Sequence, residues 1–160
     1  MNPPPRPEDE TLALKRVLHF LKFRPRSRKE IMLYLKERGF SPETASLVVD
    51  RIEASGLSGD AEFARLWVES RLRHRPKGKR SLAFELRQKG ISEDLIETAL
   101  ADIDEEATAL SAVHQKRRQW ERLDNIDVYR KIIDFLRRRG FPFALCRQIA
   151  EQMIHENGIT

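Results

Sequence analysis

A motif that recurs about every 50 residues constrains the fold of this 160-residue chain more than any other feature of its sequence. The spacing is regular, since the glycines of successive copies are 51 and 50 residues apart. Such a period indicates one supersecondary unit that is repeated and packs against its neighbours. The three copies read Leu35-Lys-Glu-Arg-Gly39, Leu86-Arg-Gln-Lys-Gly90 and Leu136-Arg-Arg-Arg-Gly140.

Apolar residues recur at fixed distances around each copy of the motif. One lies four residues before each leucine, and others lie nine and thirteen residues after each glycine. Residues four apart share one face of a helix, so these positions are predicted to form a repeated core. A further apolar helix precedes each copy, through Val17, Phe63 and Val113, which makes a unit of three helices. The recurring positions are Ile31, Leu82 and Ile132, then Val48, Ala99 and Ile149, then Ile52, Ile103 and Met153.

Start and stop signals predict where the helices begin and end. Ser27 and Glu30 have the spacing of a capping box, and Ser41 precedes a proline at a first helical position. The repeated glycines are typical left-handed C-terminal caps. We therefore predict nine helices, at about 9–24, 27–38, 42–55, 60–75, 79–89, 93–102, 104–122, 126–139 and 142–156.

These elements predict an all-α fold of three tandem three-helix repeats in an elongated, curved arrangement. The repeats cover 11–57, 58–103 and 104–157, after a disordered, proline-rich and acidic tail at 1–10. Repeat stacks of this kind present extended surfaces, which bind extended partners more often than they catalyse reactions.

The residues give no indication of catalysis, a cofactor or a metal. The four histidines lack ligand spacing, and no nucleophile–base arrangement or phosphate-gripping glycine loop is present. Cys146 falls where the other copies have Ala45 and Ile96, which predicts a buried apolar role in place of a reactive thiol. No apolar run is long enough to span a membrane, and no secretory signal is visible.

Charge is distributed in blocks. The net charge is only +5, from 30 Lys and Arg against 25 Asp and Glu, but residues 71–89 hold eight basic residues and one acid. Much of this block surrounds a turn from Pro76 to Gly78, where side chains and free backbone N–H groups could grip phosphates. An ordinary solvated surface is the alternative. The eight candidates are Arg71, Arg73, Arg75, Lys77, Lys79, Arg80, Arg87 and Lys89.

A second candidate basic group is Arg137, Arg138 and Arg139, of which only part can face one partner because the three point around a helical turn. Between the two groups, residues 93–106 hold seven acids and no base. Helix capping and solubility explain these acids, or else contact with a basic protein surface. Trp67 and Trp120 could stack unpaired bases, although their helical spacing favours core packing.

Several of these residues together resemble the RecX family of regulatory proteins. They are Asp60-Ala-Glu-Phe63-Ala64, Arg71, Lys77-Gly78, Glu85-Leu-Arg-Gln-Lys-Gly-Ile-Ser92 and Phe135-Leu-Arg-Arg-Arg-Gly-Phe141. The resemblance covers about residues 12–155. It implies tandem three-helix repeats and a non-enzymatic, negative modulator of the RecA recombinase, which binds RecA filaments on DNA and restrains recombination, DNA repair and the SOS response.

The same resemblance implies that the chain binds single- and double-stranded DNA through its basic patches, and we expect a cytoplasmic monomer without a membrane partner. Two other hypotheses remain open at this point. The chain is a stand-alone DNA-binding protein, which the acidic segment disfavours, or it is a repeat scaffold for another protein, with incidental basic patches.

Overall fold

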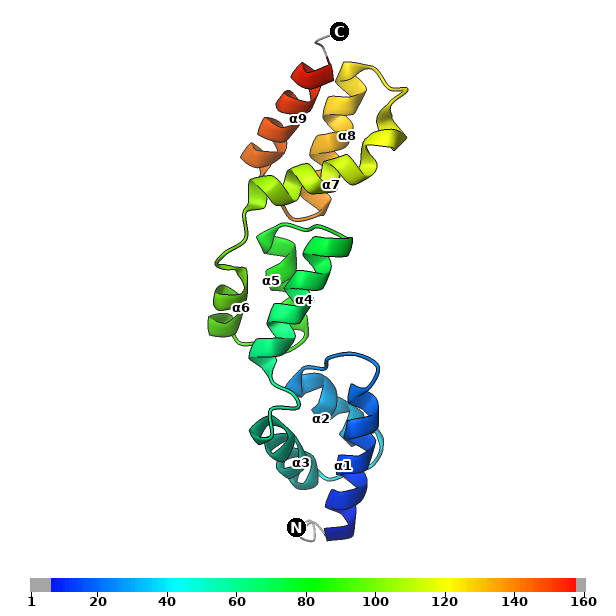
Figure 1. The fold of residues 1–160 in the computed structure, drawn as a ribbon, viewed down its shortest axis with the longest axis vertical. Coiled ribbons are helices and arrows are strands. Elements are labelled where there is room, and N and C mark those ends of the chain that lie inside the picture. The colour runs from blue at the N-terminus through cyan, green and yellow to red at the C-terminus, as the bar shows by residue number, and fades with distance from the viewer. Residues whose placement is uncertain (1–6, 158–160) are drawn as a thin grey trace. The chain divides into compact units, whose positions relative to one another are not determined.

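The structure, a computed structural model, describes residues 7–157. Every regular element in that range is a helix (Figure 1). The helices are α1 (Pro7–Leu21), α2 (Arg28–Glu37), α3 (Pro42–Ala54), α4 (Asp60–His74), α5 (Lys79–Gln88), α6 (Glu93–Leu100), α7 (Glu105–Trp120), α8 (Asn125–Arg138) and α9 (Phe143–Asn157). The predicted all-α fold of three repeated three-helix units is confirmed, and each helix boundary lies within three residues of its prediction.

The described residues form two compact units. Unit 1 contains residues 7–66 and 86–96, and unit 2 contains residues 67–85 and 97–157. The division runs through α4, α5 and α6, so the middle repeat contributes residues to both units. The predicted repeat boundaries at 11–57, 58–103 and 104–157 stay predictions.

Side-chain caps start the helices where the sequence indicates. Ser27 and Glu30 form the predicted capping box of α2: Glu30 N–H donates to Ser27 Oγ at 3.2 Å, and Ser27 N–H donates to Glu30 Oε2 at 3.0 Å. Ser41 caps α3 ahead of Pro42, as predicted. Asp104 and Asp124 cap α7 and α8. Each cap satisfies a backbone donor that the helix itself leaves free.

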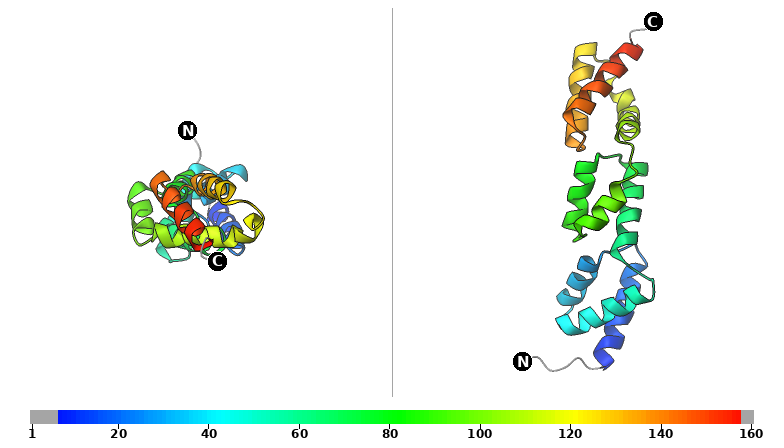
Figure 2. Two further views of the ribbon diagram at one scale, coloured as in Figure 1. Left: turned by 90° about the horizontal axis from the view of Figure 1, so that it is seen from above. Right: turned by 90° about the vertical axis from the view of Figure 1, so that its left-hand side faces the viewer.

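The repeated positions form the cores. The aliphatic residue and the leucine of each motif are fully buried in all three copies: Ile31 and Leu35, Leu82 and Leu86, Ile132 and Leu136. In unit 1, α1, α2 and α3 pack around Val17, Ile31 and Leu35. In unit 2, α7, α8 and α9 pack around Val113, Ile132 and Cys146, and α8 and α9 lie side by side (Figure 2). Cys146 is buried, as predicted.

Some details differ from the prediction. Residues 7–10, expected in the tail, form the first turn of α1, because Pro7 suits a first helical position and acidic residues follow it. Residues 1–6 of the predicted tail lie outside the described residues. Ala99 and Ile103 are only half-buried, since α6 ends at Leu100.

Candidate nucleic-acid interface

Two turns of unit 2 that are far apart in the sequence make direct backbone contact. Gly78 N–H donates to the carbonyl oxygen of Arg139 at 2.8 Å, and Arg139 Nη1 donates to the carbonyl oxygen of Pro76 at 3.0 Å. The approach is so close that a Cβ on Gly78 would lie 2.3 Å from the carbonyl oxygen of Gly140. The start of α5 and the end of α8 are therefore held together, and with them the two basic groups that the sequence separates.

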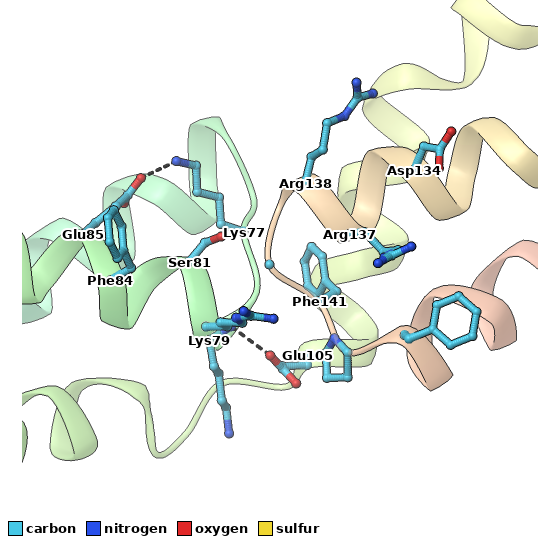
Figure 3. Close-up of a pocket in the computed structure, with 14 residues that line it drawn as sticks. Lys77, Lys79, Ser81, Phe84, Glu85, Glu105, Asp134, Arg137, Arg138 and Phe141 are labelled. Atoms are coloured by element: carbon cyan, nitrogen blue, oxygen red, sulfur yellow. Dashed lines mark hydrogen bonds and ion pairs between the residues drawn. The ribbon is translucent and has the colours of Figure 1, made fainter.

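An open pocket of about 1180 Å³ lies where these turns meet (Figure 3). Three of its cationic side chains come from the first basic group and two from the second. Glu85, Glu105 and Asp134 also line it, so cations outnumber acids by five to three. We call this site the basic pocket; its cationic side chains are Lys77, Lys79, Arg80, Arg137 and Arg138.

Glu85 neutralises part of the first basic group. Its carboxylate accepts hydrogen bonds from Trp67 Nε1 at 2.9 Å, from Arg71 Nε at 3.0 Å and from Lys77 Nζ. Burial alone would raise the pKa of the Glu85 carboxyl, but the hydrogen bonds from Lys77, Trp67 and Arg71 outweigh burial and lower it. Arg71 and Lys77 thus hold α4, the turn and α5 together, which leaves less of their charge for a ligand.

The other four cations of the basic pocket have no acidic partner in the part of the chain that the structure describes. They are Lys79 and Arg80, at the start of α5, and Arg137 and Arg138, at the end of α8. Arg80, Arg137 and Arg138 are exposed, and Lys79 is half-buried. These four side chains are the strongest candidates for contact with an anionic partner.

Arg139 serves the fold of unit 2. Besides its bond to Pro76, its guanidinium lies 4.7 Å from the centroid of the Phe135 ring. Burial, and to a lesser extent the charge of nearby Arg75, lowers the pKa of Arg139. Arg75 itself is exposed and does not line the basic pocket.

The remaining predicted residues lie elsewhere and are ion-paired. Arg73 pairs with Glu69 at 3.0 Å on the exposed side of α4. Arg87 and Lys89 belong to unit 1, where Arg87 Nη2 donates to Glu93 at 3.0 Å and Lys89 Nζ lies 2.7 Å from Glu30. The structure therefore does not bring all eleven candidates into one site.

Two of the backbone N–H groups at this turn, which were expected to grip a phosphate, instead donate hydrogen bonds within the protein. Lys79 N–H donates to Glu105 Oε1 at 2.8 Å, and Gly78 N–H donates to Arg139. Glu105 is one of the seven acids of residues 93–106. Together with the pairing of Glu93 with Arg87 and the capping of α7 by Asp104, this gives three of those acids local structural roles.

Two aromatic side chains in the basic pocket were missed by the sequence reasoning. Phe84, on α5, is 60% exposed, and Phe143, the first residue of α9, is 54% exposed. A signal for Phe84 existed: it lies midway between the core positions Leu82 and Leu86, which places it on the opposite face of the helix. Phe141 also lines the pocket but is buried. Trp67 and Trp120 are both half-buried, and Trp120 packs edge-on against Phe135 at 5.6 Å.

Residues 7–157 contain no helix that is long and apolar enough to cross a membrane. Over the same residues, no group of three or more His, Cys, Asp or Glu side chains is placed to hold a metal ion.

Three repeated three-helix units, with a cationic pocket built from two distant turns, define an all-α repeat protein. The matches to known proteins make the class specific, because family models of the first, second and third three-helix domains of RecX match residues 13–51, 60–100 and 104–149. The chain belongs to the RecX family.

Curated relatives that are regulatory RecX proteins match the sequence along almost the whole chain. The regulatory protein RecX of Mycobacterium avium (strain 104) is 40% identical over 154 residues, covering 92% of this chain and 89% of that protein. The regulatory protein RecX of Prosthecochloris aestuarii (strain DSM 271 / SK 413) is 36% identical, covering 91% of this chain and 96% of that protein. The crystal structure of RecX from Lactobacillus salivarius has the same fold, with a TM-score of 0.78 at 19% identity over 91% of this chain and 97% of that one.

Proposed function

We propose that this chain is a negative modulator of the RecA recombinase, which acts in the cytoplasm as a monomer bound to RecA filaments on DNA. Membership of the RecX family supports a regulatory role. In this proposal the basic pocket contacts DNA phosphates, and other surfaces of the repeats contact RecA. Joining several weak contacts in one chain would give a high effective concentration along a filament.

The observation that carries the proposed DNA contact is the meeting of Lys79 and Arg80 with Arg137 and Arg138 in one open pocket. A cation that is already paired with an acid of the same protein adds little to the binding of an anion. Arg71 and Lys77, which both pair with Glu85, are examples. Four cations without such partners keep their charge for phosphate contacts, which position a protein on nucleic acid regardless of base sequence.

The test is a RecA strand-exchange and ATPase assay on single-stranded DNA with increasing amounts of the protein. We expect both activities to fall with the wild-type chain and to fall much less with R137Q/R138Q. The matched control is R16Q/R51Q, which removes the same charge from exposed arginines of unit 1.

Unchanged RecA activity at saturating wild-type protein would overturn the proposal. If the chain then bound bare DNA tightly, the stand-alone DNA-binding hypothesis would replace it. If R16Q/R51Q lost as much of its ability to inhibit RecA as R137Q/R138Q did, the effect would be due to net charge and not to the basic pocket.

A further inference from the structure

Two exposed phenylalanine rings border the unpaired cations of the basic pocket. Phe84 is 60% exposed and Phe143 is 54% exposed, although both lie within well-formed helices that have buried faces for apolar residues. Single exposed apolar side chains are ordinary on a protein surface. Here, however, two exposed rings line the same pocket near cationic side chains. The pocket therefore presents flat, apolar surfaces next to positive charge.

Each ring has cationic side chains in its surroundings. The guanidinium of Arg137 lies 5.6 Å from the centroid of the Phe143 ring, and Arg138 lines the same pocket. On the α5 side, Lys79 and Arg80 lie within the two turns that precede Phe84. Three acids also line the pocket, but Glu105 accepts from the Lys79 N–H group and Glu85 from Trp67, Arg71 and Lys77. The third acid is Asp134.

A ligand for this pocket must therefore offer negative charge and flat, apolar faces together. Nucleic acid offers phosphates and base faces, but a duplex keeps its base faces stacked on one another inside the helix. A single strand can turn its bases out onto aromatic side chains, and each stacked base contributes about 1–3 kcal/mol to binding.

We infer that the basic pocket is a single-strand-selective site, in which Phe84 and Phe143 stack unpaired bases while Lys79, Arg80, Arg137 and Arg138 contact the phosphates. The inference rests on the proposed function, since it assumes that this pocket contacts nucleic acid. It adds that the pocket prefers single-stranded to duplex nucleic acid, and that two phenylalanines cause this preference.

The experiment measures the binding of fluorescently labelled oligo-dT, of a duplex of equal length and of an abasic strand of equal length by anisotropy. We expect wild type to prefer oligo-dT. Replacing either ring in F84L or F143L should weaken oligo-dT binding about tenfold, near the lower end of the range for one stacked base. Duplex and abasic-strand binding should change less than twofold, because neither presents a free base face.

Tyrosine variants control for the fold and for the aromatic requirement. F84Y and F143Y keep a flat ring and should retain oligo-dT binding within about twofold, with circular dichroism and melting temperature as the checks on folding. Because both rings are exposed, the leucine variants should also melt at the wild-type temperature. If a leucine variant unfolds, the tyrosine variant and the abasic strand still decide the question.

The outcomes separate this inference from the proposed function. The stacking inference would be overturned if F84L and F143L bound single strand, duplex and abasic strand with equally reduced affinity, or if they bound oligo-dT as well as wild type does. The proposed DNA contact would still stand in that case, provided that R137Q/R138Q weakens the binding of all three ligands. No effect of R137Q/R138Q on any ligand would overturn both. Displacement of oligo-dT by a short Glu/Leu peptide at lower concentration than by unlabelled oligo-dT would assign the pocket to an acidic protein segment.

Discussion

At the scale of single residues, carboxylates decide how much positive charge this protein can offer to a partner. Glu85 engages Arg71 and Lys77, Glu30 engages Lys89 and Arg24, and Glu105 occupies the first N–H group of α5. Each of these acids also joins separate helices or turns. The same side chains therefore stabilise the fold and limit the charge available for binding.

Glu30 should make unit 1 sensitive to acid. Burial opposes its ionisation, but hydrogen bonds from Arg24, Lys89 and Ser27 outweigh burial and lower its pKa from 4.5 to about 2. Because the folded-state pKa lies below the unfolded value, the stabilisation is present above about pH 4.5 and is lost as the pH falls toward 2.

We expect E30Q to lower the free energy of unfolding by about 1–2 kcal/mol at pH 7, allowing for solvent screening. The difference from wild type should shrink between pH 4.5 and 2. Urea unfolding at a series of pH values measures both. E37Q, on the same helix but exposed, is the control and should cost less than about 0.5 kcal/mol. A pH-independent gap would contradict the assignment.

Glu105 should weaken the binding of anions to the basic pocket. E105Q removes one negative charge from the pocket and retains an oxygen that can accept from the Lys79 N–H group. Affinity for oligo-dT should rise about two- to fivefold, the scale of one unit charge at a partly solvated site. The control is E106Q, since the exposed neighbour Glu106 does not line the pocket. An equal gain in both variants would point to net charge alone.

At the scale of elements, the glycines that end the repeated motifs do not all have the same role. Gly39 and Gly140 both have positive φ, at +85° and +84°, which only glycine adopts at little cost. A Cβ added at Gly39 would have no neighbouring atom within 4 Å, whereas a Cβ at Gly140 would lie 2.1 Å from Ser81 Oγ. Gly140 is thus both a helix cap and the point where the end of α8 meets α5.

This contrast predicts unequal costs for one substitution. G39A should lower the free energy of unfolding by about 1–2 kcal/mol, the cost of a left-handed conformation. G140A should cost more, about 3–4 kcal/mol, because backbone contact between the two turns must also be lost. Chemical denaturation of both variants measures the difference. Oligo-dT binding should fall in G140A and persist in G39A; equal behaviour of the two variants would contradict the role given to the turn contact.

At the scale of the whole molecule, the small net charge of +5 conceals strongly opposed blocks. Three of the seven acids of residues 93–106 are used locally: one pairs with Arg87, one caps α7 and one binds the start of α5. The cationic side chains of the basic pocket outnumber its acidic side chains, so the pocket carries a net positive charge. Binding driven by such a site depends on counterion release, and therefore on salt.

Four unpaired cations predict a salt slope of about −3 for a single strand, at about −0.7 per phosphate contact. In R137Q/R138Q the slope should be shallower by about 1.4, while R16Q/R51Q should keep the wild-type slope. Anisotropy titrations between about 50 and 200 mM salt provide the measurement. A slope that both variants change equally would show that contacts are spread over the chain.

The sequence alone determined the features that depend on neighbours along the chain. The repeat, the helix boundaries, the caps at Ser27 and Ser41, and the buried position of Cys146 follow from local spacing, because a helix brings together residues three and four apart. The alignment of the copies also predicted the buried aliphatic and leucine of each motif, but Ala99 and Ile103 of the middle copy are only half-buried.

Which charges share a site depends on tertiary contacts. Lys79 and Arg137 line one pocket, whereas Arg87 and Lys89 belong to the other unit although they are nearer to Lys79 in the sequence. The tertiary structure also showed that Glu85 neutralises Lys77 and that Phe84 borders the cations. The joining of the two basic groups depends on backbone contact between turns about 60 residues apart, and no local pattern of residues encodes that contact.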